Sequence, residues 1–544
     1  MTLRLLAALL ALGGCAAAPA QPPSRPRLIV VISVDQFSAD LFAEYRQHFS
    51  GGLRRLSQGA VFPAGFQSHA ATETCPGHST ILTGARPART GIIANNWTDQ
   101  SAARDDKYIY CAEDERVPGS DSDHYTVSDV HLRVPTLGDL MRRADPASRI
   151  VAVAGKDRAA VMMGGHGPNE RWWWTGRAFV SHAGRAVPAA VAAANARAAS
   201  ALAAPHAAVP LDPACAGRSR AVAVGSGART VGDGRFARPG GDEGLFRASP
   251  EFDSAILDLA AGLRATMRLG QGRAIDLLAI GVSATDYVGH RYGTQGAEMC
   301  LQLLALDRAL GAFFATLDRA GIDYVVVLTA DHGGLDLPER AREQGLPDAV
   351  RAEAALNPAA MNDALRAQLG LGGRILYGDG PFGDMYVTRA EPEPVRRRIR
   401  EAAVAAYRAH PQVAAVFTRE EIAATPPPSG PPEAWSLLER VRASFDAERS
   451  GDFYVILRPL VTPIARPGSS GSVATHGSVW DYDRRVPILF WRRGMAGFEQ
   501  PLGVETVDIM PSLAALIGLP LAPGSVDGRC LDLIAGPDTS CPSP

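Results

Sequence analysis

Three apolar runs, rich in β-branched residues, each end at an aspartate in this chain. They are residues 28–34 before Asp35, residues 277–285 before Asp286, and residues 324–330 before Asp331. Continuous hydrophobic runs of this kind are typical of strands that are buried on both faces of a parallel sheet. Ligands of open α/β sheets bind beyond the carboxyl ends of such strands. The pattern predicts an α/β fold with a mostly parallel central sheet flanked by helices on both faces, and three carboxylates in one crevice.

Histidines accompany these aspartates at spacings that suit metal binding. Asp286 is followed by three residues and then His290, His332 is adjacent to Asp331, and His476 lies in a Gly/Ser-rich segment. Taken singly, each aspartate could cap a turn or a helix, but the joint occurrence favours a metal site. Carboxylates and imidazoles are ligands of borderline divalent ions such as zinc. Together with the first aspartate they exceed one tetrahedral shell, which predicts two Zn²⁺ per chain, a clamp for phosphoryl displacement.

Length and charge restrict the organisation and the partners. The chain has 544 residues, and large α/β enzymes often elaborate one sheet with insertions. We expect one main domain, residues 21–544, with insertions near 164–251 and 335–463. The formal net charge of -2 gives no indication of a nucleic-acid partner.

The N-terminus predicts export. Arg4 precedes an apolar stretch, residues 5–12, and small residues follow as far as Ala20, as in a secretory signal peptide over residues 1–20. Leu12-Gly13-Gly14-Cys15 also resembles a bacterial lipobox, so a lipid anchor at Cys15 is the alternative. We expect a periplasmic or secreted protein, or a lipoprotein attached to a membrane.

The remaining cysteines favour structural disulfides. Six cysteines besides Cys15 are an even number, and none has CxxC spacing. Cys530 and Cys541 form the simplest pair, while the other pairings stay open. Cys75 precedes a proline, but the sulfatase pattern Cys-x-Pro-x-Arg is absent, so Cys75 is expected to be a disulfide partner.

Thr74 is the candidate nucleophile. It lies in the segment Thr-Glu-Thr-Cys-Pro-Gly-His, before a helix that we expect to begin near Ser79. Coordination to a metal is one of the few ways in which a lone threonine hydroxyl becomes nucleophilic. No Ser-His-Asp signature is visible in the sequence.

Hydrophobic periodicity places further elements along the chain. Residues 164–251 are expected to be irregular, with an Ala-rich exposed helix within 186–209. We expect helices over 38–56, 136–143, 252–269 and 296–320, and strands over 149–154, 383–387, 453–457 and 487–491.

These residues together resemble the alkaline phosphatase superfamily, in the branch related to nucleotide pyrophosphatases and phosphodiesterases. Within that branch the chain is similar to bacterial alkaline phosphatases with a threonine nucleophile. The resemblance extends from Val34-Asp35-Gln36 to Thr475-His476-Gly477. It implies one zinc ion held by Asp35, Thr74, Asp331 and His332, and a second held by Asp286, His290 and His476.

The resemblance also implies a set of phosphate-binding groups. Asn95, 21 residues after Thr74 in the context Gly-Ile-Ile-Ala-Asn, matches a family asparagine that donates to a phosphate oxygen, with Asn96 as the alternative. Lys156 and Arg158 match the element that distinguishes monoesterases from diesterases. A dianionic phosphate exposes an extra charged oxygen, and we expect two cations at a strand end to reach it.

The sequence therefore predicts a zinc-dependent alkaline phosphomonoesterase that forms a phosphothreonine at Thr74. Small-molecule phosphate monoesters are the expected substrates, and the protein is expected to be a monomer. The alternatives are a phosphodiesterase or nucleotide pyrophosphatase on the same scaffold, and a metal-stabilised binding protein without turnover. His78 and the tryptophans at 172–174 are expected to be structural, whereas Asp121, Ser122 and Asp123 form a candidate Ca²⁺ site or an acidic surface loop.

Overall fold

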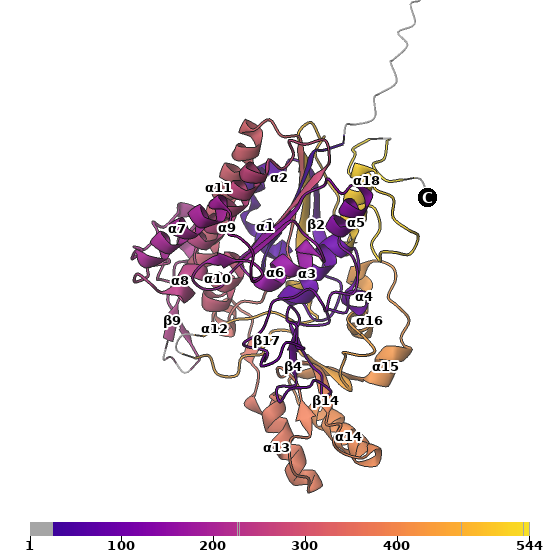
Figure 1. Ribbon diagram of the computed structural model, residues 1–544. Coiled ribbons are helices and arrows are strands. Elements are labelled where there is room, and N and C mark those ends of the chain that lie inside the picture. The colour runs from indigo at the N-terminus through magenta and orange to yellow at the C-terminus, as the bar shows by residue number, and fades with distance from the viewer. Residues whose placement is uncertain (1–24, 226, 228, 469–470, 537, 543–544) are drawn as a thin grey trace, which may run out of the picture.

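The computed structural model describes residues 25–225, 227, 229–468, 471–536 and 538–542 (Figure 1). The predicted signal peptide and Cys15 lie outside the described residues. The centre of the molecule is a ten-stranded sheet. Its strands, in spatial order, are β19 (Phe498–Glu499), β2 (Ala60–Phe66), β18 (Arg485–Arg492), β11 (Tyr324–Thr329), β1 (Leu28–Val34), β10 (Asp276–Val282), β5 (Ile150–Ala154), β6 (Glu170–Trp174) and β7 (Phe179–Val180), with β20 (Val504–Glu505) beside β2.

The middle of this sheet is parallel, as predicted. Strands β11, β1, β10, β5 and β6 run in one direction, whereas β18 is antiparallel to β11. Every residue of β1 is buried, since helices cover both of its faces. The three apolar runs are the three neighbouring strands β11, β1 and β10, so their carboxyl ends lie side by side.

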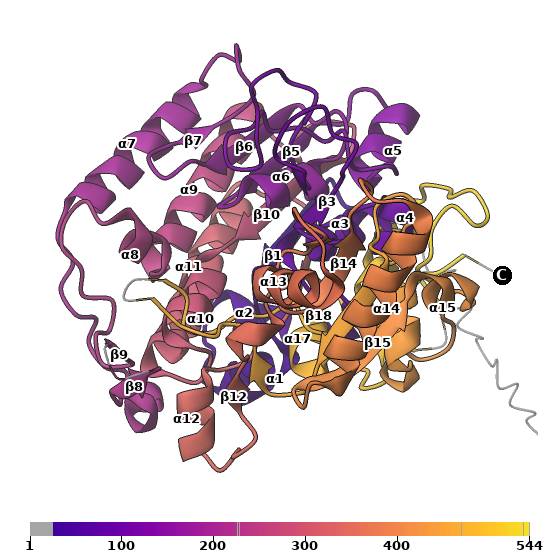
Figure 2. The ribbon, with the colours of Figure 1, turned by 90° about the horizontal axis from the view of Figure 1, so that it is seen from below.

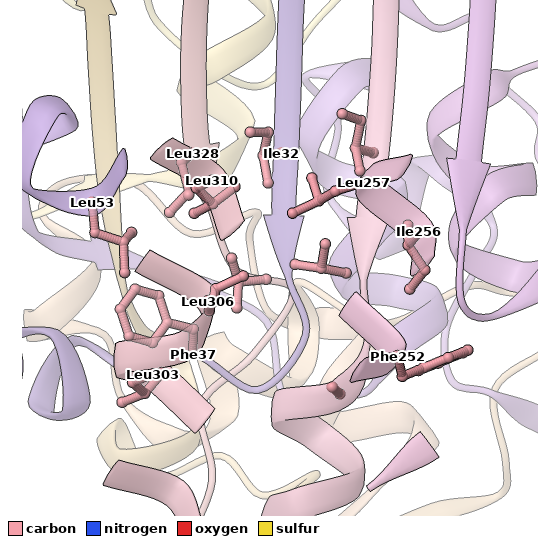
Figure 3. Close-up of a cluster of buried hydrophobic side chains, with 14 of the residues drawn as sticks. Ile32, Phe37, Leu53, Phe252, Ile256, Leu257, Leu303, Leu306, Leu310 and Leu328 are labelled. Carbon is pink, nitrogen blue, oxygen red and sulfur yellow. The ribbon is translucent and has the colours of Figure 1, made fainter. Parts of the chain in front are cut away.

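Two groups of helices sandwich the sheet, and alternate residues of β1 point into two separate cores. The first core, part of which Figure 3 shows, contains Ile32 and Leu328 from the sheet with Leu257 and Leu306 from helices. Its helices are α1 (Ala39–Tyr45), α2 (Gly52–Leu56), α9 (Pro250–Met267) and α11 (Ala297–Arg319). Helices on the other face are α3 (Thr74–Thr83), α5 (Leu137–Ala144), α6 (Asp157–Gly164) and α18 (Ile509–Ile517). The predicted α/β architecture is confirmed.

Among the described residues, α11 is the helix with the length and hydropathy to cross a membrane. Most of its residues are buried, and it packs against α9 and α2. It is therefore the core helix of this face.

Two helix predictions were wrong in their boundaries. The single helix expected over 38–56 is broken between α1 and α2, because the carboxylate of Asp307 accepts backbone N–H groups of Ser50, Gly51, Leu53 and Arg54 at 2.6–3.2 Å and starts a new helix there. Helix α3 begins at Thr74 and not near Ser79. Pro76 lies in its first turn, where the missing N–H is tolerated.

The prediction that Asp286 lies at the end of a strand was also wrong. Strand β10 ends at Val282, and Asp286 lies in the first turn of α10 (Ala284–Tyr292). The apolar residue Ala284 extended the hydrophobic run past the true strand end. Likewise Lys156 caps α6 and Arg158 lies in its first turn, after β5 rather than on its end.

Residues 358–457, which we call the second lobe, lie beyond the carboxyl ends of the central strands (Figures 1 and 2). They contain an antiparallel sheet in the order β13 (Leu376–Tyr377), β14 (Gly383–Val387), β16 (Phe453–Leu457) and β15 (Val413–Thr418). Helices α13 (Pro358–Leu369) and α14 (Glu393–Ala409) enclose a separate core with it. Strands β14 and β16 have the bounds that the sequence predicted.

The segment after residue 164 is less irregular than expected. Strands β6 and β7 continue the central sheet, and Trp172, Trp173 and Trp174 are buried in its two cores. The Ala-rich stretch forms α7 (Ala189–Ala203), with one face packed on α9. The small hairpin β8 (Val222–Val224) and β9 (Arg229–Val231) follows, then α8 (Glu243–Arg247).

Three disulfides join Cys75 to Cys111, Cys215 to Cys300, and Cys530 to Cys541. The predicted Cys530–Cys541 pair is confirmed, and so is the expectation for Cys75. The first bridge attaches the start of α3 to the end of a hairpin formed by β3 (Asn96–Thr98) and β4 (Tyr108–Tyr110).

Candidate active site

The first group of predicted metal ligands lies at the ends of β1 and β11. The side chains of Asp35, Asp331 and His332 are completely buried there. His332 Nε2 lies 3.5 Å from Asp35 Oδ1 and 3.3 Å from Asp331 Oδ2. His332 Nδ1 is hydrogen-bonded to the carbonyl oxygen of Gly333 at 2.9 Å, so Nε2 faces the carboxylates.

The backbone turn after β1 is unusual. Gln36 has a positive φ of 64°, a left-handed conformation that is rare outside glycine. In this conformation the N–H of Gln36 donates to Asp331 Oδ1 at 3.2 Å. The turn therefore ties the ends of the two strands together, and strained backbone of this kind concentrates at functional sites.

The second group contains Asp286, His290 and His476. His290 Nε2 and His476 Nε2 lie 3.3 Å and 3.4 Å from Asp286 Oδ1. Each ring is oriented by its other nitrogen: Nδ1 of His290 lies 2.9 Å from the carbonyl of Ala474, and Nδ1 of His476 lies 2.8 Å from that of Thr72. The spacing of Asp286 and His290 on one turn of α10 puts both on the same face of that helix.

The two groups lie against each other. The rings of His332 and His476 stack, with centroids 3.5 Å apart. Within each group the nearest ligand atoms all lie within 4.8 Å of one another. All the predicted Asp and His ligands are thus brought together in one place.

The donor atoms fit divalent cations. Asp35 Oδ1, Asp286 Oδ1, Asp331 Oδ2 and His332 Nε2 are buried and have no hydrogen-bond partner among the described residues. Unsatisfied buried polar atoms are costly, so such a cluster implies a ligand. Burial, with the neighbouring Asp331, raises the pKa of Asp35 well above its ordinary value, and burial lowers the pKa of His332 to about 3. His332 is therefore neutral, as a metal ligand must be.

Thr74 is the first residue of α3 and lies beside both groups. Its Oγ1 is 3.3 Å from Lys156 Nζ and 3.5 Å from Arg158 Nη2. Lys156 Nζ also lies 2.8 Å from Asp35 Oδ2 and 2.6 Å from Asp286 Oδ2. Although burial opposes it, these two carboxylates raise the pKa of Lys156, so the lysine stays charged.

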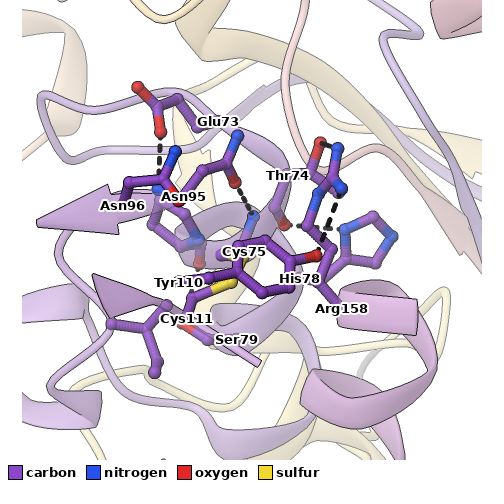
Figure 4. The surroundings of a disulfide bond; sticks show 12 residues. Glu73, Thr74, Cys75, His78, Ser79, Asn95, Asn96, Tyr110, Cys111 and Arg158 are labelled. Atoms are coloured by element: carbon purple, nitrogen blue, oxygen red, sulfur yellow. Dashed lines mark hydrogen bonds between the residues drawn. A yellow bond between two sulfur atoms is a disulfide. The ribbon is translucent and has the colours of Figure 1, made fainter. Parts of the chain in front are cut away.

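Asn95 immediately precedes β3 and is hydrogen-bonded to the start of α3. Its Oδ1 accepts the N–H of Cys75 at 2.8 Å, and its own N–H donates to Glu73 Oε2 at 2.6 Å (Figure 4). The neighbouring Asn96 turns instead toward the second lobe, where its Nδ2 donates to Asp379 Oδ2 at 3.1 Å.

A cavity of about 320 Å³ opens above Thr74. Its floor includes Thr74, Asn95, Arg158, His290 and His476, and its opposite wall comes from the second lobe. The wall residues include Asp379, Phe382, Asp384 and Tyr454. A substrate that reaches Thr74 therefore passes between the central sheet and the second lobe.

Three further residues of the site were not predicted to take part in it. Glu73 lines the cavity, and burial raises its pKa to about 7. His78, expected to be structural, is buried with its Nδ1 3.1 Å from Asp331 Oδ2. Asp253 of α9 accepts the N–H of Ala284, at the start of the helix that carries Asp286 and His290. Glu73 and His78 lie in the same segment as Thr74, whereas only proximity in three dimensions connects Asp253 to the site.

The candidate Ca²⁺ loop lies away from this cavity. Asp121 Oδ1 accepts the N–H groups of Asp123 and His124 at 2.8 Å and 2.6 Å. This hydrogen bonding is that of an acidic surface turn, the alternative given by the sequence.

The chain is similar to known proteins over nearly its whole length. The chain is 58% identical to alkaline phosphatase PhoK of Sphingomonas sp. over 519 residues, which cover 95% of this chain and 92% of the relative. It is 50% identical to alkaline phosphatase PhoD of Zymomonas mobilis over 96% of this chain and 90% of that protein. The crystal structure of wild-type alkaline phosphatase PafA shares the fold, with a TM-score of 0.80, 24% identity, and coverage of 95% of this chain and all of that one. The family model for type I phosphodiesterases and nucleotide pyrophosphatases matches residues 29–479, and the chain belongs to this family.

Proposed function

We propose that this protein is a zinc-dependent alkaline phosphatase that hydrolyses phosphate monoesters through a phosphothreonine at Thr74. Its high identity to two alkaline phosphatases over nearly the whole chain supports the enzyme class. This finer proposal is supported by the position of Thr74 Oγ1, which lies within 3.5 Å of both Lys156 and Arg158 and beside the two groups of candidate metal-ligand side chains.

The ligand groups divide into two sets. Asp35, Thr74, Asp331 and His332 would hold one zinc ion, and Asp286, His290 and His476 would hold the other. When bound, two zinc ions would act as Lewis acids that lower the pKa of a coordinated hydroxyl and neutralise charge on the phosphoryl and leaving oxygens. The donor set of carboxylates and neutral imidazoles supports zinc.

The side chains of the protein then carry out two displacements. Thr74 Oγ1 gives up its proton to solvent and attacks phosphorus, the Oγ1–P bond forms, and the ester P–O bond breaks as the alkoxide leaves with the bonding electron pair and takes up a proton from water to become the alcohol. Water next attacks the phosphothreonine, which releases inorganic phosphate and restores the hydroxyl. Asn95, Lys156 and Arg158 bind the phosphoryl oxygens, on which negative charge concentrates in each transition state.

Replacement of Thr74 tests the proposal. Thr74→Ala is expected to lower the kcat/KM for p-nitrophenyl phosphate by at least about 10³-fold, because the variant lacks the hydroxyl that would form the covalent intermediate. Thr74→Ser retains a hydroxyl and is expected to keep measurable activity and to yield a phosphoserine on acid quenching. Unchanged phosphate release by Thr74→Ala would exclude Thr74 as the nucleophile, whereas the absence of phosphate release by the wild-type protein would favour the binding protein without turnover.

The alternative function is that of a phosphodiesterase or nucleotide pyrophosphatase, which the family also includes. Lys156 and Arg158 favour the monoesterase, because a dianionic phosphate offers them an additional charged oxygen. Comparison of p-nitrophenyl phosphate with bis-p-nitrophenyl phosphate decides between the two. A preference for the diester would overturn this assignment of the two cations.

The remaining parts of the proposal concern location and organisation. We propose that the protein is exported to the periplasm or the medium, either by cleavage of the signal peptide or with a lipid on Cys15. Mass spectrometry of the mature N-terminus tests this. The division into a main domain 21–544 with insertions near 164–251 and 335–463 is part of the same proposal. The monomer stays a prediction that light scattering checks, and metal analysis checks two Zn²⁺ and any Ca²⁺ per chain.

A further inference from the structure

A cluster of two tyrosines and an aspartate lies beside Arg158. Asp157 Oδ1 accepts the hydroxyl of Tyr110 at 2.7 Å, and Asp157 Oδ2 accepts the hydroxyl of Tyr125 at 2.7 Å. The rings of the two tyrosines pack with centroids 4.7 Å apart. Each oxygen of the Asp157 carboxylate therefore accepts one phenol hydroxyl, and Oδ1 also accepts the backbone N–H of Arg158 at 2.7 Å.

Tyr110 also contacts the guanidinium group itself. Its hydroxyl oxygen accepts from Arg158 Nη1 at 3.3 Å, while Nη2 of the same group points to Thr74 Oγ1 at 3.5 Å (Figure 4). Within the described part of the chain the guanidinium forms no ion pair with a carboxylate at 4.0 Å or less. Tyr110 is thus a neutral side chain that orients the Arg158 guanidinium group. It leaves the positive charge of that group available to a phosphate oxygen.

Backbone hydrogen bonds and a disulfide hold the strand that carries Tyr110 in place. Tyr110 pairs with Asn96 across the β3–β4 hairpin, and the next residue, Cys111, donates its N–H to the carbonyl of Asn95 at 2.9 Å. Cys111 is also joined by a disulfide to Cys75, the residue after Thr74. The hairpin therefore links the nucleophile, Asn95 and the support of Arg158 in one unit.

The ionisation of the phenol suits an alkaline phosphatase. Burial, with the nearby charge of Asp157, raises the pKa of Tyr110 well above its ordinary value, and the same causes raise that of Tyr125. Both hydroxyl groups consequently remain protonated and keep donating to Asp157 in alkaline solution.

We propose that Tyr110, held by Asp157 and Tyr125, is a positioning residue that aims Arg158 at the phosphate and so contributes to the preference for monoesters over diesters. This inference rests on the proposed function, because it assumes that Arg158 binds the extra oxygen of a dianionic phosphate. Tyr110 itself does not touch the reacting atoms, and its effect passes through Arg158.

Tyr110→Phe tests the inference, because it keeps the buried ring and removes only the hydroxyl. The kcat/KM for p-nitrophenyl phosphate is expected to fall about tenfold, and that for bis-p-nitrophenyl phosphate by less than about twofold. In an Arg158→Ala background the same change is expected to have no further effect on the monoester. Asp157→Asn, which preserves the shape of the side chain, is a second variant expected to show the same selectivity. Tyr407→Phe is the matched control, because it also removes a buried hydroxyl, one that is hydrogen-bonded to the Leu356 carbonyl. Its kinetics are expected to be unchanged.

Two outcomes would overturn the inference. One is an equal loss on both esters; the other is a full additional loss in the Arg158→Ala background, since either indicates a general structural role. Failure of the proposed function is recognised separately: the wild-type enzyme would release no phosphate from the monoester, or Arg158→Ala would leave that activity unchanged. Those results would remove the basis of the inference as well.

Discussion

The imidazole rings of His332 and His476 stack with their centroids 3.5 Å apart and their planes 15° from parallel. His332 follows β11, whereas His476 lies in the segment that returns to the site after the second lobe. The stack joins one ligand of the first group to one ligand of the second. The geometry of each group therefore depends on the other.

Removal of His476 is expected to lower the metal content from about two zinc ions per chain to about one or less. Phosphate release should fall at least about 100-fold, since even residues that only orient ligands commonly change activity by this much. Mass spectrometric metal analysis of His476→Ala checks the stoichiometry. His410→Ala, at a histidine of the second lobe that faces Glu353, is the control. Retention of two ions by His476→Ala would show that His476 is not a ligand.

Gly77 allows the first turn of α3 to approach the end of β11. A Cβ atom at this position would lie 2.0 Å from the backbone carbonyl oxygen of Asp331. Because backbone atoms cannot move aside easily, Gly77→Ala is expected to destabilise the fold by about 1–3 kcal/mol. It should also displace Thr74 from Asp331 and reduce kcat. Thermal unfolding and kinetics of Gly77→Ala check both effects.

Gly372→Ala is the matched control for this change. Gly372 is exposed, and a Cβ atom there meets nothing within 4 Å. It should therefore alter neither the melting temperature nor kcat. A Gly77→Ala variant with the same stability and activity as this control would contradict the close approach.

The position of a candidate ligand was predictable from the sequence where that residue follows a long apolar strand. Asp35 directly follows β1 and Asp331 lies two residues after the end of β11, and both strands are uninterrupted runs of β-branched and apolar residues that the sequence makes visible. Asp286 was assigned to the wrong kind of element, since Ala284 is apolar enough to continue the pattern of β10. Tyr110 and Asp253 could not be found at all, because their roles arise from contacts between segments distant in sequence.

The Cys75–Cys111 disulfide joins the residue after Thr74 to the residue after Tyr110. The Cys75→Ala/Cys111→Ala variant is expected to lose about 4 kcal/mol of stability in the chain-entropy model, and to lower monoester kcat/KM because the hairpin that carries Asn95 is released. The Cys530→Ala/Cys541→Ala variant is the control, for its bridge lies near the C-terminus and outside the lining of the cavity. Kinetics of both variants under identical conditions give the comparison. Equal kcat/KM values for the two would indicate that the first bridge has no part in holding the site.

Asp253 makes the free energy of unfolding depend on pH. This dependence can be measured separately from the effect of metal binding. Its carboxylate is buried in α9 and accepts bonds from the Ala284 N–H and from Gln302 Nε2, each at 2.8 Å. Burial raises its pKa from 3.8 to about 7. Because the folded state holds this proton more tightly than the unfolded chain, the contribution is fully present below the unfolded pKa and is lost as pH rises toward about 7.

Urea unfolding of the wild-type protein and of Asp253→Asn at about pH 4 and about pH 8 measures this contribution. Asparagine does not titrate, so the free energy of unfolding of the wild type is expected to fall relative to that of the variant by up to about 4 kcal/mol between the two conditions. Any release of metal at the lower pH affects both proteins, and their difference isolates residue 253. Asp258→Asn, at an exposed position of α9, controls for the loss of a carboxylate from this helix. A difference between wild type and Asp253→Asn that stays constant with pH would mean that the pKa of Asp253 is the same in the folded and the unfolded state.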